Sequence, residues 1–249
     1  MANLTAERRN RMAQILLSEG SIKVGEMAEL FGVSTETIRK DIIHLEEKGI
    51  AEKSFGGAIA KISIVEKPLN ERALLHAEEK AAIAACATEL IPDHASILLD
   101  AGSTTNAIAK QLLLHPGLTI LTNSLELASI LSDAESDVFL IGGWSTSRLR
   151  RLHADLAFLG SDGFQEQGGP TSVSYDEASV KAAMLRAASK TYIVADSSKA
   201  LSTAQFSYAD WSDVSGVITA GSHAPEMERL LKDKARLLIA PPLARGAES

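Results

Sequence analysis

The sequence has very few of the residues that build disulfide frameworks and metal sites. One cysteine, Cys86, occurs among 249 residues, so no disulfide can form within the chain and no cysteine-based metal cluster can assemble. The six histidines do not cluster in the sequence, and metal-ligand spacings such as HExxH do not occur. The sequence therefore predicts neither a metal site nor a bound cofactor.

Long apolar runs are also missing from the sequence. Stretches such as 96–99 and 138–141 are far shorter than the roughly eighteen residues that a membrane-spanning helix needs. The first residues include Arg8, Arg9 and Arg11, but they show neither the apolar core nor the cleavage pattern of a secretory signal. We therefore expect a cytoplasmic protein that has no membrane partner.

An excess of basic residues is absent as well. The net charge of −7 at pH 7 argues against a protein that coats nucleic acid with a basic surface. Residues 1–61 hold nine basic and nine acidic side chains, so the acidic excess lies entirely in the remainder of the chain. A neutral N-terminal module can still bind DNA if its basic groups share one face.

Three helices are expected in the first fifty residues. Apolar residues at helical spacing predict helices over 5–18 and 24–31, each followed closely by a glycine. A third helix is predicted over 34–49, where Ser34 is a favourable N-cap residue. Its apolar positions recur at helical spacing: Ile38, Ile42 and Leu45.

A short hairpin is expected directly after the third helix. Residues 51–60 contain two β-prone arms around Gly56 and Gly57, a dipeptide that permits the positive φ angles of a tight turn. Three helices followed by a hairpin predict a winged helix-turn-helix in which the hairpin is the wing.

The apolar stripe of the third helix determines which of its side chains face outward. On an isolated helix, basic residues usually form a solvated face, but three correctly spaced helices and a wing favour DNA contact instead. Arg39 could form paired hydrogen bonds with a guanine or bind a phosphate, and Lys53 on the wing suits the DNA backbone or minor groove. The outward side chains in the N-terminal half of this helix are Thr35, Glu36, Arg39 and Lys40.

Beyond the wing, helix and strand patterns alternate, which predicts a mostly parallel sheet covered by helices. We place a DNA-binding domain at 4–60, a connecting segment at 61–78 and a larger α/β domain at 79–249. Helices are predicted over 79–90, 104–114, 125–132, 177–189 and 225–232, and strands over 96–100, 118–122, 138–142, 156–160, 191–196, 214–219 and 236–239.

Small polar residues follow several of these strands. Where a strand is followed by a helix, backbone amides and the helix dipole converge in a geometry that favours a phosphate. Each such residue alone usually only caps the next helix, but several ends of parallel strands could face one crevice. The residues concerned are Gly102, Ser103, Thr104, Thr105, Thr122, Asn123, Ser124, Gly142 and Gly143, with charged groups at Asp176, Glu177, Lys181, Asp196 and Lys199.

The segment VSTETIRKDIIHLEEKGIAEKSFGGA, residues 33–58, resembles the N-terminal signature of the DeoR family of bacterial transcriptional regulators. In this chain Lys40, Lys53 and Phe55 stand where the family often has Arg, Arg and His, so preferences for DNA half-sites do not transfer. The resemblance implies a winged helix with five residues at the DNA: Ser34, Thr35, Thr37, Arg39 and Lys40.

The ordered set LDAGSTT, TNS, GG, DEASVK and ADSSK also resembles the effector domain of that family. That domain is similar in fold to ribose-phosphate isomerases and amino-sugar-phosphate deaminases, and its effectors are typically phosphorylated intermediates of sugar catabolism. The resemblance places these residues at or near the effector pocket: Asp100, Gly102, Ser103, Thr104, Thr105, Thr122, Asn123, Asp176, Lys181 and Lys199.

One stretch departs from the family pattern. Between Gly143 and the motif ADLAFLGSDGF, only ten residues intervene, and the family usually has about twenty more, the length of a βα unit. Either this protein lacks an element that covers the pocket, or the sequence omits a segment. In both cases the sequence does not predict how the pocket closes over its effector.

The sequence therefore predicts a transcriptional regulator, most simply a repressor of a sugar-catabolism operon, controlled by a phosphorylated sugar. Its expected partners are double-stranded operator DNA, that sugar and further copies of the chain in a homodimer or homotetramer. One alternative is an isomerase-like or deaminase-like enzyme that carries a DNA-binding module and uses a pair such as Asp176 and Lys181. Another is a protein-protein adaptor. No serine-histidine or cysteine-histidine arrangement stands out, so we expect no catalytic residues.

Overall fold

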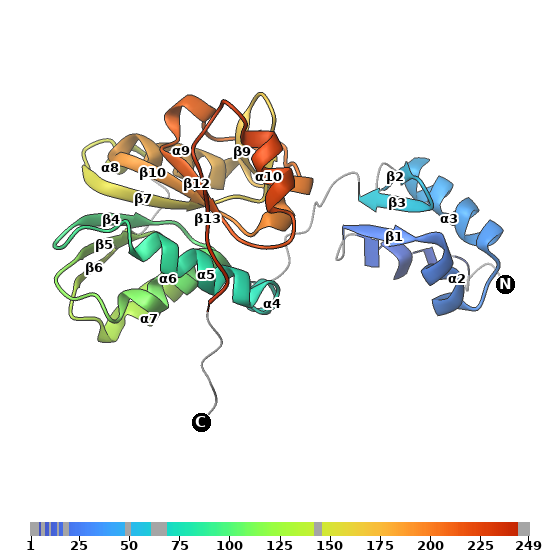
Figure 1. Ribbon diagram of the computed structural model, residues 1–249, viewed down its shortest axis with the longest axis horizontal. Coiled ribbons are helices and arrows are strands. Elements are labelled where there is room, and N and C mark those ends of the chain that lie inside the picture. Colours follow the sequence, from blue (N-terminus) through green and yellow to red (C-terminus); the bar gives the residue numbers. More distant parts are fainter. Residues whose placement is uncertain are drawn as a thin grey trace. The chain divides into compact units, whose positions relative to one another are not determined.

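The computed structural model divides into two compact units, Met1–Lys67 and Pro68–Ser249, which are described separately below (Figure 1). No helix within the ranges that the structure describes combines the length and the apolar character needed to span a bilayer. The structure describes residues 5, 8–9, 11–13, 15–16, 20–47, 51–60, 69–141 and 146–243.

The first unit combines helices with a small antiparallel sheet. Its described residues before Gly20 are helical, and the sheet has the strand order β1-β3-β2. Strand β1 was not predicted, because three residues between two helices are too few to show a period of two. The elements are β1 (Ser21–Lys23), α2 (Val24–Phe31), α3 (Thr35–Glu47), β2 (Ala51–Ser54) and β3 (Gly57–Ala60).

The predicted apolar stripe forms the core of this unit. Helix α2 ends at Gly32, whose φ of 61° is left-handed and whose N–H donates to the carbonyls of the last turn. Strand β3 pairs with both neighbours, so that Ala58 lies opposite Ile22 on one side and Lys53 on the other. The buried core residues include Met12, Leu16, Met27, Ile38, Ile42 and Leu45.

The second unit is built around a seven-stranded sheet in which every neighbouring pair is parallel. The strand order is β13-β12-β10-β7-β4-β5-β6. This confirms the predicted mostly parallel sheet. The strands are β4 (Ser96–Leu99), β5 (Thr119–Thr122), β6 (Asp137–Leu140), β7 (Ala154–Gly160), β10 (Ala188–Val194), β12 (Gly216–Thr219) and β13 (Leu237–Ile239).

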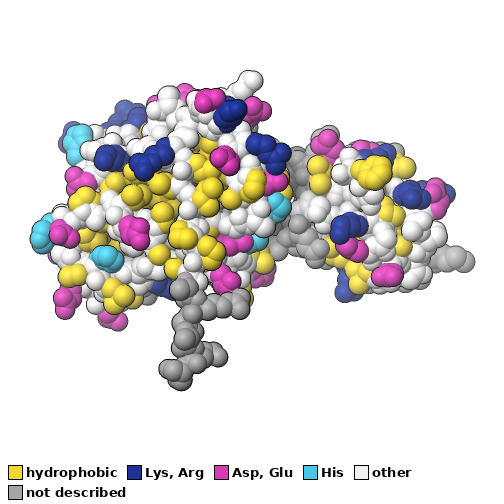
Figure 2. Space-filling view, viewed as in Figure 1, with side chains coloured by type: hydrophobic (Ala, Val, Ile, Leu, Met, Phe, Trp, Pro, Cys, Tyr) yellow, Lys and Arg dark blue, Asp and Glu magenta, His cyan; other side chains and the backbone are white. Residues whose placement is uncertain are grey.

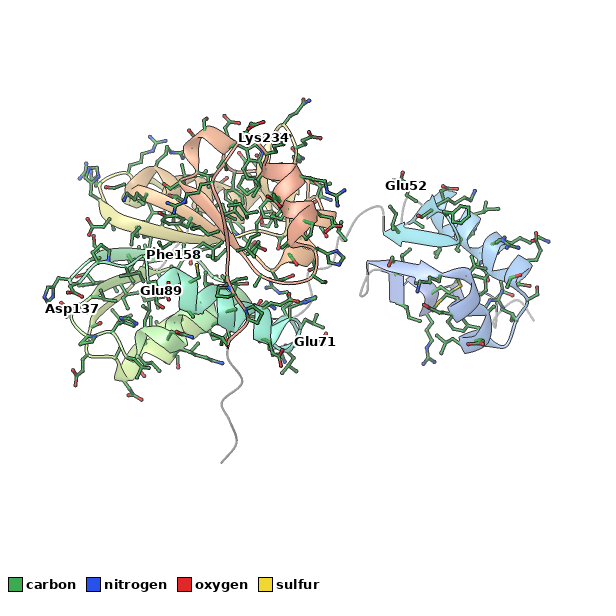
Figure 3. The ribbon with its side chains drawn as sticks, viewed as in Figure 1. Glu52, Glu71, Glu89, Asp137, Phe158 and Lys234 are labelled. Atoms are coloured by element: carbon green, nitrogen blue, oxygen red, sulfur yellow. The ribbon has the colours of Figure 1, made fainter. Side chains whose placement is uncertain are left out.

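Helices cover both faces of this sheet (Figure 1). Successive residues of β4 point to opposite faces, so Ile97 and Leu99 pack in one apolar cluster and Leu98 in another. Phe158 of β7 lies deep in the unit and is fully buried, while the exposed residues Asp137 and Glu71 lie at its periphery (Figure 3). The helices are α5 (Ala77–Thr88), α6 (Ser103–Leu112) and α7 (Leu125–Ile130) on one face, with α8 (Thr146–Leu149), α9 (Tyr175–Ala187) and α10 (Ala224–Leu231) on the other.

Several elements of the second unit were not predicted. Helix α4 (Leu69–Leu74) and the start of α5 lie inside the predicted connecting segment 61–78, so that part of the prediction is wrong. A second, antiparallel sheet was missed because its short strands, GFQ, GPTS and FS, lack the apolar runs that marked the equally short strands of the main sheet. These strands are β8 (Gly163–Gln165), β9 (Gly169–Ser172) and β11 (Phe206–Ser207), and three short 3₁₀ helices complete the unit: η1 (Leu131–Asp133), η2 (Ser197–Leu201) and η3 (Trp211–Asp213).

Candidate functional site

Helix α3 begins with a side-chain cap that fixes the turn before it. The Ser34 hydroxyl accepts a hydrogen bond of 3.2 Å from the Thr37 backbone N–H, which satisfies one of the free donors at the helix start. The two hydroxyls of Ser34 and Thr37 also lie 2.9 Å apart. Of the residues that the resemblance placed at the DNA, Ser34 and Thr37 therefore also shape the helix start.

The outward face of α3 is polar and open to solvent. Thr35 and Lys40 are exposed, and Arg39 has 60% of its side chain exposed. Arg39 lies 3.5 Å from Glu36, and such a solvent-exposed pair is worth little, so it can be exchanged for a contact with DNA. This is the placement that the apolar stripe predicted for a recognition helix.

The wing is tied to the same helix. Lys53 of β2 forms an ion pair of 2.8 Å with Glu46 of α3, and the Lys53 backbone N–H donates to the other oxygen of that carboxylate at 3.3 Å. The cation that sequence reasoning assigned to the DNA backbone is thus positioned by the recognition helix itself.

A buried carboxylate joins the recognition helix to the first helical segment. Asp41 is 1% exposed and accepts hydrogen bonds from Arg8 Nε at 2.7 Å and Arg9 Nε at 2.6 Å. Sequence reasoning missed Asp41. Its spacing from Ile38 and Leu45 put a charge on the apolar stripe, and that was the signal that could have found it.

In the second unit, polar residues gather where the parallel strands end. Asp100 follows β4, Thr122 ends β5, Gly160 ends β7 and Asp196 follows β10. Because these strands are parallel and adjacent, their carboxyl ends meet at one edge of the sheet. We call Asp100, Thr122, Asn123, Gly160 and Lys181 the strand-end cluster.

A buried ion pair lies at the centre of this cluster. Lys181 of α9 lies 3.1 Å from Asp100, and the two side chains are 6% and 3% exposed. The Lys181 ammonium also donates to the Gly160 carbonyl at 3.0 Å, and the Gly160 N–H donates to Asp100 at 3.3 Å. Tyr208 packs against this ion pair. Its hydroxyl donates to the Gly160 carbonyl at 2.7 Å, and its ring centroid lies 5.5 Å from the Lys181 ammonium.

The surroundings keep Lys181 charged. Burial disfavours the ammonium, but the carboxylates of Asp100 and Asp162 outweigh burial, so the pKa of Lys181 is raised above its ordinary value. Burial raises the pKa of Tyr208, which therefore remains a neutral phenol. The carboxylate that pairs with Lys181 is Asp100 and not Asp176, the residue that the enzymatic alternative would use, which is exposed in the first turn of α9.

The start of α6 presents backbone and hydroxyl groups beside this pair. The Thr105 hydroxyl donates to the Gly102 carbonyl at 2.8 Å, and the Ala101 N–H donates to the Asn123 side chain at 3.1 Å. Gly102 and Ser103 are half-buried, whereas Thr104 and Thr105 are buried. The half-buried positions are thus the ones that can meet an anion at this helix start.

Other predicted site residues have different placements. The Thr122 hydroxyl is buried and accepts from the Ser124 N–H at 3.1 Å, so it shapes the turn after β5. Lys199 is half-buried in η2. Gly142 and Gly143 lie outside the described residues. Sequence reasoning missed Asn106, whose side-chain N–H₂ donates to Glu126 at 2.9 Å and whose oxygen is buried without a hydrogen-bond partner among the described residues.

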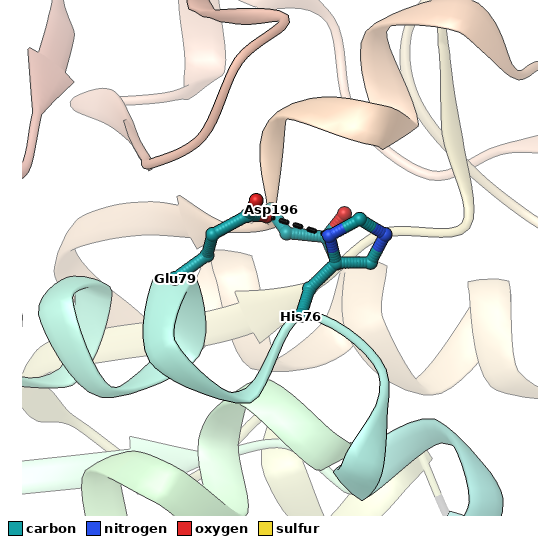
Figure 4. A group of neighbouring side chains, drawn as sticks. All are labelled: His76, Glu79 and Asp196. Atoms are coloured by element: carbon teal, nitrogen blue, oxygen red, sulfur yellow. Dashed lines mark ion pairs between the residues drawn. The ribbon is translucent and has the colours of Figure 1, made fainter.

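His76, Glu79 and Asp196 come together beside α5, with possible ligand atoms all within 4.8 Å of one another (Figure 4). His76 Nδ1 lies 2.9 Å from Glu79 Oε2 in an ion-pair contact that lacks hydrogen-bond geometry. Lys80 is 4% exposed and interacts electrostatically with Asp196. Burial lowers the pKa of Lys80, although Asp196 partly opposes this shift. A dication would meet the repulsion of that buried ammonium, so the cluster is better described as an ion-pair network than as a metal site.

One surface hollow in the described part of the second unit lies away from the strand-end cluster. It is lined by residues that precede β4 and β5, including Pro92, His94 and His115, and therefore lies where those strands begin. Acidic, basic and apolar side chains are interspersed over the visible face of this unit (Figure 2).

These two units together define a class of protein. A winged helix-turn-helix with an exposed polar recognition helix is a DNA-binding module, and the α/β unit places polar groups at the strand ends where such sheets bind ligands. The chain is a DNA-binding transcriptional regulator with a sensor domain.

Comparison with known proteins identifies the family. The description "DeoR-like helix-turn-helix domain" matches residues 8–63, and "DeoR C terminal sensor domain" matches residues 75–221. The chain belongs to the DeoR family of transcriptional regulators, as its motifs predicted.

Relatives in several bacteria are similar along most of the chain. The regulator YulB of Bacillus subtilis is 32% identical over 260 residues, covering 97% of this chain and 99% of that protein. This alignment is longer than the 249-residue chain, so it contains gaps on this chain's side, which agrees with a shortened segment without locating it. The regulator IolR of the same species is 30% identical over 86% of this chain and 90% of its own. The glycerol-3-phosphate regulon repressor of Escherichia coli is 29% identical over 91% and 95%.

Among solved structures, the ribose 5-phosphate isomerase of Methanocaldococcus jannaschii is similar to part of the chain. The match has 18% identity and a TM-score of 0.41, and it covers 50% of this chain and 54% of that one. A similarity this weak says nothing about what the chain binds.

Proposed function

We propose that this regulator is a repressor whose affinity for operator DNA is controlled by a phosphorylated sugar or polyol bound at the strand-end cluster. The observation that supports it most directly is the buried, charged Lys181 beside the open start of α6. A fixed ammonium and a helix N-terminus at one sheet edge suit an anionic group, and Asp100 and Asn123 supply acceptors that suit hydroxyl groups.

The names of relatives agree with this effector class. One of them is a glycerol-3-phosphate regulon repressor, and the family of the sensor domain is shown by residues 75–221. Operators with two half-sites require at least a dimer, so we propose that the working form is a homodimer or homotetramer.

The enzymatic alternative is disfavoured by the state of Lys181. A lysine that acts as a base or nucleophile must lose its proton, but the pKa of Lys181 is raised and its ammonium is engaged by Asp100 and Gly160. We therefore propose that the sensor domain binds its ligand without turnover. Steady conversion of a ribose or amino-sugar phosphate by the purified protein would overturn this.

A phosphorylated effector is expected to stabilise the protein against heat. A ligand at a hundred times its dissociation constant adds about 2.7 kcal/mol to the native state, so one sugar phosphate in a panel should raise Tm while its free sugar does not. The panel is measured by thermal unfolding and includes glycerol 3-phosphate.

The matched variant for this experiment is Ser103→Asp. Its carboxylate would interact favourably with the N-terminus of α6 but repel a phosphate there. We expect Ser103→Asp to keep its own stability and lose the ligand-dependent rise in Tm. An equal rise in the variant would contradict binding at the start of α6, and no rise with any phosphate in the wild-type protein would contradict the effector class.

Arg39→Ala is expected to weaken operator binding, because Arg39 is an exposed cation on the outward face of α3. Loss of a base or phosphate contact of this kind costs about 1–3 kcal/mol. The measurement is a titration of a fluorescent duplex, selected by the wild-type protein from a random-sequence library, with Lys232→Ala of the second unit as the control. Equal affinity of Arg39→Ala and the wild-type protein would refute the assignment of α3 as the recognition helix.

A further inference from the structure

The tip of the wing carries an aromatic side chain that the fold leaves entirely in solvent. Phe55 is 108% exposed and stands in the turn between β2 and β3. A buried aromatic ring removes a large apolar area from water and contributes strongly to folding, whereas this ring contributes nothing to the core of the first unit. Its position therefore suits contact with something outside the chain.

The hairpin that carries the ring has a well-defined backbone. Gly56 has a φ of 81°, a conformation that suits glycine in a tight turn. At Gly57 an added Cβ would lie 2.0 Å from the Ile22 carbonyl oxygen, so the backbone of the wing presses directly against β1. The base of the wing is thus packed and paired, and the ring projects from a supported turn.

A cation close to the ring in the sequence indicates the chemistry of its partner. Lys53 lies two residues before Phe55, is 50% exposed, and is held by Glu46 of the recognition helix. An apolar ring beside a cation, on a hairpin attached to the recognition helix, suits the minor groove of a DNA duplex, where the cation meets phosphate and the ring meets sugars and base edges.

We propose that Phe55 is a wedge that enters the minor groove of the operator beside the major-groove site of α3, and that it selects sequences by how easily they deform. This inference rests on the DNA-binding function of the chain. Apolar wedges partly unstack a base step and bend the duplex, and pyrimidine-purine steps such as TA and CA yield most easily. The wing would then contribute specificity without reading base-pair hydrogen bonds.

The ring and the cation predict different dependences on salt. Phe55 neutralises no phosphate, so Phe55→Ala should lower affinity without changing the slope of log K against log salt. Loss of stacking between the ring and a base should lower the affinity of Phe55→Ala for operator DNA by about 5- to 150-fold. Lys53→Ala should instead reduce that slope by about one.

The experiment uses the full-length protein and duplexes that it selects from a random-sequence library. Affinity is titrated at several salt concentrations for the wild-type protein, Phe55→Ala, Phe55→Trp and Lys53→Ala, and 2-aminopurine at the TA or CA step under the wing reports unstacking. We expect Phe55→Ala to lose affinity and the 2-aminopurine signal at unchanged salt slope, and Phe55→Trp to keep both. Because Phe55 touches no core residue, the thermal unfolding of Phe55→Ala should match the wild-type protein.

Three outcomes would overturn the proposal. The first is unchanged affinity of Phe55→Ala. The second is a loss of affinity with an unaltered 2-aminopurine signal, which would indicate a contact that does not open the base step. The third is a change of oligomeric state in size-exclusion chromatography, with unchanged affinity per assembled protein, which would make the ring a contact between copies of the chain.

Discussion

Asp41→Ala is expected to destabilise the DNA-binding unit by about 1–3 kcal/mol, the usual cost of leaving largely buried hydrogen-bond donors without their acceptor. Asp41 is 1% exposed and holds both Arg8 and Arg9 at hydrogen-bond distance. Its removal leaves two guanidinium groups without their carboxylate and releases the first helical segment from α3. A small unit has little stability to spare, so operator binding should fail together with folding.

The position of the tryptophans makes this prediction easy to localise. Both, Trp144 and Trp211, belong to the second unit, so their fluorescence reports that unit, whereas circular dichroism reports both. In urea unfolding followed by circular dichroism, the transition of the first unit should move to a lower urea concentration in Asp41→Ala. The fluorescence midpoint, which reports the second unit, should stay unchanged. Glu36→Ala is the matched control, because its carboxylate is 66% exposed on the same helix. Equal destabilisation by both variants would show that burial of the Asp41 pair is unimportant.

Lys181→Met is expected to destabilise the sensor unit by about 3–5 kcal/mol, because it leaves Asp100 buried without its counter-charge. The readout is the fluorescence of Trp211, which is 7% exposed and donates its ring N–H to the carbonyls of Gln165 and Glu166. Lys110→Met makes the same chemical change at an exposed site of α6 and should have almost no effect.

The double variant Asp100→Leu with Lys181→Met separates charge burial from shape. Replacing both partners of a buried pair by apolar residues is often neutral, so the double variant should recover much of the stability that Lys181→Met loses. It should also lose the effector-dependent rise in Tm. If the double variant instead loses as much stability as Lys181→Met and Asp100→Leu lose together, the two side chains do not interact in the folded protein.

The pH dependence of this effect follows from the raised pKa of Lys181. A group whose folded pKa lies above its ordinary value of 10.5 contributes stability fully below that value, and the contribution is lost only as the pH rises toward the folded pKa. The difference between the wild-type protein and the double variant Asp100→Leu with Lys181→Met should therefore stay constant from about pH 6 to pH 9, because the double variant has no unpaired buried carboxylate that could titrate there. A difference that changes in this range would point to another titrating group.

The sequence predicted the elements whose signals are local. The stripe of Ile38, Ile42 and Leu45 indicated both helix α3 and its outward face, because three residues at helical spacing determine which side is buried. The alternation of helices and strands likewise predicted the parallel sheet. Strands β1 and β11 offer no comparable signal, because their two or three residues contain no apolar run and their stability comes from pairing with distant segments.

Long-range pairing also explains the errors at the sites. The motifs place both Asp100 and Lys181 near the pocket, but in the sequence Lys181 stands close to Asp176 and far from Asp100. Only the packing of α9 against β7 and β10 brings Lys181 to Asp100. Asp41 was overlooked for the same reason, because the arginines that it binds lie in another helix.

Helix α4, where the chain enters the second unit, is held by charge instead of by apolar packing. Its six residues include no buried side chain, and a helix of that length has little stability of its own. The buried ammonium of Lys80 donates to the carbonyls of Arg72 and Leu75, which a helix end otherwise leaves unmatched. The same ammonium feels the charge of Asp196 at the end of β10. An anion that attracted the Lys80 ammonium away from these carbonyls would therefore remove the hydrogen bonds that hold α4. The apolar core would not be disturbed.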